Sequence, residues 1–143
     1  MGISGRTPEE ESIARRIEEQ KNLQKRKDQE SKTEVKKIVT LWTPVFQQYV
    51  ATMAKKLGTQ FRVGWMRPPW EGCELVYEWV FIFAVGNNDV ANINFHFNHN
   101  DPYIVITCGD KGESYQISSR NDLEALTPTL FEKLYKEVIN AQR

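Results

Sequence analysis

Short segments of alternating apolar and polar residues, joined by brief turn-forming stretches, fill the middle of the 143-residue chain. Strict alternation is typical of β-strands that bury one face. The joining stretches are too short for the crossovers that parallel strands need, so the strands are expected to form an antiparallel meander. The expected strands are 61–66, 73–85, 90–97, 103–108 and 113–118, and the turns between them are 67–72, 86–89, 98–102 and 109–112.

An amphipathic helix is expected before the strands. Apolar residues recur three and four positions apart from Val35 to Leu57, which is the spacing of one broad helical face, and Gly58 is suited to end the helix. Pro44 interrupts this stripe because it lacks the N–H that would bond the carbonyl four residues earlier. The helix must therefore kink at Pro44 or restart there with Thr43 as its N-cap.

A second amphipathic helix is expected after the strands, from Pro128 to Ala141, with Thr127 as its N-cap. Its apolar stripe consists of Leu130, Phe131, Leu134, Tyr135, Val138 and Ile139. Two interpretations of 119–126 stay open. Either Ser119 or Asn121 caps a short helix there, or the stretch crosses over the edge of the sheet.

Helix, meander and helix together predict an α+β fold. Each helix has one apolar face, and both faces need the same apolar side of the sheet. We therefore expect a two-layer sandwich with a four- or five-stranded antiparallel sheet and both helices on one of its faces. Residues 33–143 are predicted to form this single domain.

Residues 1–32 are predicted to form a charged extension that is helical or partly disordered. Thr7 and Pro8 supply an N-cap and a first-turn residue, but the helix that follows has few apolar side chains with which to pack. Its main apolar anchors, Ile13, Ile17 and Leu23, form a sparse seam that could bind a partner or a second copy of the chain.

The overall composition excludes several classes of protein. Lys plus Arg and Asp plus Glu both total 19, so bulk charge does not favour nucleic acid or an anionic membrane. No apolar run is long enough to span a bilayer, and the polar start does not resemble a signal peptide. Cys73 and Cys108 are expected as buried thiols in a reducing, cytoplasmic setting.

The polar face of the predicted sheet is the first candidate site. Glu78, Asn92, Asn94 and His96 alternate with core residues, so they should share the face away from the helices. Glu78 could orient His96 for proton transfer while the asparagines bind a polar ligand. The same alternation is also what any sheet with one solvated face requires.

Three other features offer alternative sites. His96, His99 and Asp101 could hold a metal, with Cys108 as a further ligand, but their spacing matches no known metal motif, so we expect no metal or other cofactor. Lys25-Arg26-Lys27, with exposed aromatic residues, suggests weak nucleic-acid binding, although acidic residues interleave this run. Trp70 follows two prolines and could anchor a protein partner.

No catalytic constellation or phosphate-binding loop is evident in the chain. The leading hypothesis is therefore a noncatalytic protein-interaction or assembly module, with a homodimer as one form of it. The alternatives are a small-ligand-binding protein or hydrolase-like enzyme that uses the polar sheet face, and a weak nucleic-acid binder.

Overall fold

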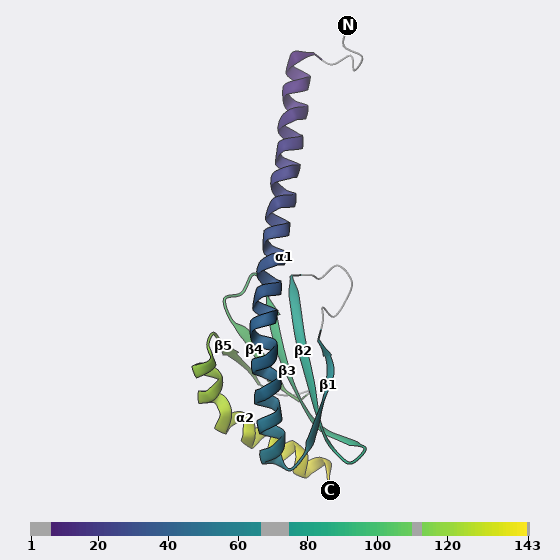
Figure 1. Cartoon of the computed structure of the whole chain (residues 1–143), viewed down its shortest axis with the longest axis vertical. Coiled ribbons are helices and arrows are strands. Elements are labelled where there is room, and N and C mark those ends of the chain that lie inside the picture. Colours follow the sequence, from purple (N-terminus) through teal and green to yellow (C-terminus); the bar gives the residue numbers. More distant parts are fainter. Residues whose placement is uncertain (1–6, 67–74, 110–112, 143) are drawn as a thin grey trace. The chain divides into compact units, whose positions relative to one another are not determined.

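The computed structural model describes residues 7–66, 75–109 and 113–142 (Figure 1). Its elements are α1 (Pro8–Leu57), β1 (Gln60–Met66), β2 (Val76–Val85), β3 (Asn88–Asn98), β4 (Ile104–Cys108), β5 (Ser114–Ile117) and α2 (Arg120–Ala141). The strands form one sheet in the order β1-β2-β3-β4-β5, and every neighbouring pair is antiparallel. The predicted α+β class and antiparallel meander are confirmed, with five strands.

The chain divides into two compact units, Met1–Glu34 and Val35–Arg143, and α1 contributes residues to both. The apolar core belongs to the second unit, because the buried hydrophobic side chains of the described residues all lie at or beyond Val35. Residues 35–57 of α1, the sheet and α2 therefore supply the folded domain.

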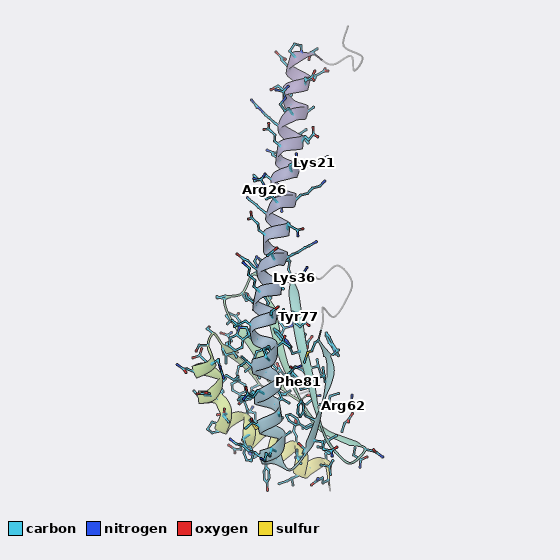
Figure 2. The ribbon with its side chains drawn as sticks, in the orientation of Figure 1. Lys21, Arg26, Lys36, Arg62, Tyr77 and Phe81 are labelled. Atoms are coloured by element: carbon cyan, nitrogen blue, oxygen red, sulfur yellow. The ribbon has the colours of Figure 1, made fainter. Side chains whose placement is uncertain are left out.

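Both helices of the second unit cover the same face of the sheet. Phe46 of α1 stacks on Phe95 of β3 with ring centroids 3.9 Å apart, and its ring meets that of Trp79 on β2 edge-on at 5.0 Å. Phe81, which Figure 2 labels on β2, is fully buried on this face. α2 packs against β3, β4 and β5. Tyr49 of α1 also contacts α2, so the two helices form one layer above the sheet, as predicted.

The ends of α1 follow the expected capping chemistry. The Thr7 hydroxyl accepts a hydrogen bond from the Glu10 N–H at 3.2 Å, and the Glu10 carboxylate accepts one from the Thr7 N–H at 3.3 Å. At the other end Gly58 has a φ of +69°, and the Thr59 N–H donates to the Ala54 carbonyl. The helix therefore begins and ends where the sequence indicated.

Pro44 neither ends α1 nor starts a new helix, so the proposed restart with Thr43 as N-cap is wrong. Pro44 and Thr40, whose carbonyl loses its helical partner, are both exposed, so water can bond the freed carbonyl. Thr43 has another role. Its hydroxyl donates to the Val39 carbonyl and accepts a hydrogen bond of 2.9 Å from the indole N–H of Trp79.

α2 begins earlier than predicted. Ser119 is its N-cap and accepts a hydrogen bond from the Asp122 N–H. Of the two interpretations left open for 119–126, the helix capped by Ser119 is therefore correct, and it continues as α2. The predicted cap at Thr127 and first turn at Pro128 are wrong, because both residues lie inside the helix. Pro128 is exposed, and so is Glu124, whose carbonyl loses the bond.

Two irregularities correct the predicted strands. Strand β2 pairs with β3 as far as Val85 and Asn88, so the connection is the two-residue turn Gly86–Asn87 and not the four-residue turn 86–89. The register of β2 against β3 also shifts between Phe83 and Ala84. Because of this shift Val90 is buried instead of lying on the polar face. A second shift lies in β1 around Gly64, near the outer edge of the sheet.

Candidate functional site

The four polar residues predicted to share one face of the sheet do so. Glu78 of β2 lies directly opposite His96 of β3, Asn94 lies opposite Val80, and Asn92 lies opposite Ile82. All four are partly buried, and their neighbours along each strand are core residues that face the helices. The pairing of Glu78 with His96, which the sequence left open, follows from the register of β2 and β3.

The two asparagines have different surroundings. Asn92 has a structural partner, since its side-chain Oδ1 accepts a hydrogen bond of 3.0 Å from the Gly109 N–H beyond the end of β4. Asn94 has none on its Oδ1, which is buried without a hydrogen-bond partner among the described residues. Binding of a polar ligand at Glu78, Asn94 and His96 stays a prediction.

The register of β3 and β4 excludes Cys108 from the alternative metal site. Cys108 pairs with Ile93 and lies on the face covered by the helices, whereas His96 pairs with Val105 on the open face. Side chains on opposite faces of a sheet cannot share one ion. In the described ranges no three His, Cys, Asp or Glu residues lie close enough together to hold a metal.

Cys108 is buried, as predicted, while Cys73 lies outside the described residues. Burial, with a smaller effect of the nearby Glu137 carboxylate, raises the pKa of the Cys108 thiol to about 12. A thiol with so high a pKa carries almost no thiolate at neutral pH and is a poor nucleophile. Cys108 is therefore a core residue and not a candidate nucleophile.

The first unit carries the predicted interaction residues on its surface. The exposed fractions of Ile13, Ile17 and Leu23 are 56%, 48% and 50%. The described basic residues from Arg15 to Lys27, including Lys21 and Arg26 in Figure 2, are exposed as well. Trp70 lies outside the described residues.

A cleft lies between the two helices of the second unit, and the sequence patterns did not predict it. It holds about 310 Å³ and is lined by residues of α1 between Val45 and Lys56 and of α2 between Arg120 and Thr127. The hydroxyls of Tyr49 and Thr127 form a 2.9 Å hydrogen bond in this cleft, and burial raises the pKa of Tyr49. No local pattern could reveal this cleft, because the two segments are far apart in the sequence.

Comparisons with known proteins found no matching protein-family model, no matching curated protein and no matching solved structure. Among the helices that the structure describes, none has the length and apolarity that a membrane span requires.

Proposed function

We propose that the protein is a noncatalytic assembly module that self-associates through its N-terminal helical segment, residues 8–34. The observation that carries this proposal is the exposure of Ile13, Ile17 and Leu23, each about half accessible to solvent. Helices in proteins owe most of their stability to the packing of an apolar face, and burial of these side chains against a second helix would stabilise this segment.

The order of side chains along one helical face supports pairing with a second copy. Residues spaced alternately by four and three positions lie along one seam of a helix. Starting at residue 9, this spacing selects Glu9, Ile13, Arg16, Gln20, Leu23 and Lys27, all on the exposed surface of the described segment. The seam is about 27 Å long at 1.5 Å per residue.

This seam is complementary to itself when two copies run antiparallel. A two-fold axis at residue 18 places Glu9 opposite Lys27 of the second copy and Ile13 opposite Leu23, so charge meets opposite charge and apolar meets apolar. Ile17 lies one position from the axis and adds apolar surface at the centre. A parallel pair would instead bring like residues together, Glu9 beside Glu9 and Lys27 beside Lys27, which is unfavourable.

The proposal is tested by reversing the two seam charges in the full-length chain. Each single variant, Glu9→Lys or Lys27→Glu, turns two attractive pairs per dimer into two repulsive ones. At roughly 0.2–1 kcal/mol per exposed pair this weakens dimerisation by about ten-fold. The double variant restores opposite charges and should recover the association of the original chain. Sedimentation velocity across a concentration series at low salt measures all three.

The matched control moves the same charges off the seam. Glu11→Lys and Lys25→Glu make the same reversals two residues away, about 200° around the helix, and should leave dimerisation unchanged. A strictly monomeric chain at high concentration would refute self-association. Equal losses in the Glu11→Lys and Glu9→Lys variants, or no recovery in the double variant, would refute the antiparallel seam.

A further inference from the structure

The cleft between α1 and α2 has the lining of a small-molecule site. Its apolar wall includes Met53 and Leu123, each only 2% exposed. Its volume of about 310 Å³ is at the lower end of the range for ligand pockets, which is roughly 300–1,000 Å³. The cleft therefore has space for a compact ligand.

The hydroxyl groups of the cleft have little hydrogen-donating capacity left. Thr127 donates its proton to the Leu123 carbonyl, so in its bond with Tyr49 the Tyr49 phenol must be the donor. Thr52 likewise donates to the Gln48 carbonyl. A polar ligand atom that needs hydrogen-bond donors must therefore find them on the Gln48 amide or on the cationic side chains of the cleft.

Two such cations line the cleft, Lys56 from the last turn of α1 and Arg120 from the first turn of α2. On α1, Lys56 lies about two helical turns after Tyr49. On α2, Arg120 lies about two helical turns before Thr127. Both cations are therefore displaced along their helices from the contact between the two hydroxyls. Neither cation has an ion-pair partner within 4.0 Å among the described residues. With Glu124 as the only acidic residue of the lining, two positive charges and one negative charge leave a net charge of +1.

We propose that this cleft binds a small organic monoanion, with its apolar body beside Met53 and Leu123 and its carboxylate attracted by the positive charges of Lys56 and Arg120. This proposal is independent of self-association, because the cleft lies wholly within the second unit. Arg and Lys side chains form charge-assisted hydrogen bonds with carboxylates, whereas a neutral group of the same shape would gain only the apolar contact.

The test uses 3-phenylpropionate as the probe and neutral 3-phenylpropan-1-ol as its matched control, titrated into the full-length protein and followed by NMR. We expect the carboxylate to shift the Met53 and Leu123 methyl resonances and to bind at least about five-fold more tightly than the alcohol. Lys56→Gln and Arg120→Gln should each weaken its binding about three- to five-fold. Both residues are exposed, so the variants should fold normally.

Lys55→Gln is the matched protein control, since Lys55 is also exposed in the last turn of α1 but does not line the cleft. Its affinity for the probe should equal that of the original chain. Three results would each overturn the proposal: no shift of the cleft resonances at millimolar probe, equal affinity for the alcohol, or a loss in Lys55→Gln as large as that in Lys56→Gln.

Discussion

Replacing Thr43 by valine tests how α1 is attached to the sheet. The substitution keeps the shape of the side chain but removes the acceptor of the Trp79 indole N–H, whose hydrogen bond is 2.9 Å long. Trp79 is fully buried, so its N–H would be left without water as a substitute partner. A buried donor without a partner costs roughly 1–3 kcal/mol, and we expect the free energy of unfolding to fall by about that amount.

Urea unfolding followed by Trp fluorescence measures this change, and the urea dependence of the unfolding free energy should stay the same. Thr40→Val is the matched control. Its hydroxyl also donates to a carbonyl four residues earlier, but Thr40 is exposed and accepts no bond from the sheet among the described residues. The control should stay within about 0.5 kcal/mol of the original chain. If Thr43→Val is equally mild, the indole bond does not stabilise the packing of α1 on β2.

Two further predictions concern the region around β4. Gly109→Ala should destabilise the protein by up to about 1 kcal/mol more than Gly86→Ala, as measured by urea unfolding. Both glycines have positive φ, but only at Gly109 must the Glu137 carboxylate shift to make room for the added methyl. Equal losses would refute this close approach. In a Cys73→Ser background, the remaining thiol at Cys108 should react with a disulfide reagent at pH 8 only as fast as the protein opens. Because folding raises the Cys108 pKa from 9.0 to about 12, its contribution to stability is complete below pH 9 and is lost as the pH rises towards 12. Rapid labelling of the folded protein at pH 8 would contradict burial of this thiol. So would a protein whose stability falls no more steeply above pH 9 than that of the Cys108→Val variant.

The sheet could be predicted from the sequence because its alternation is a local signal. Residues such as Ile93 and Phe95 differ from their neighbours in polarity, and a period of two assigns each to a face. At the two prolines, by contrast, a strong local signal led to a wrong prediction. Pro44 and Pro128 are strong local signals against a helix interior, but each lies on the exposed side of a long helix, where water can bond the freed carbonyl and the tertiary contacts maintain the helix.

The candidate sites were predictable to different degrees. The shared face of Glu78 and His96 followed from alternation, but their direct opposition depends on the register, which residues far from either side chain set. The cleft was not predictable, because the bond between Tyr49 and Thr127 joins residues 78 positions apart and depends on how two helices cross. A site built at a helix crossing leaves no pattern in either helix alone.

Stability and association should be separable properties of this chain. The described buried core begins at Val35, whereas the seam from Glu9 to Lys27 lies wholly within the first unit. Thr43→Val should therefore lower the free energy of unfolding without changing the dimer dissociation constant at concentrations where the chain is folded. Glu9→Lys should change the dimer dissociation constant. The unfolding free energy of the monomer, measured at protein concentrations well below that constant, should stay the same. Since Glu9 and Lys27 meet at both ends of the antiparallel seam, charge pairing supplies much of its specificity. Self-association should consequently weaken as salt rises, while the apolar core should depend little on salt.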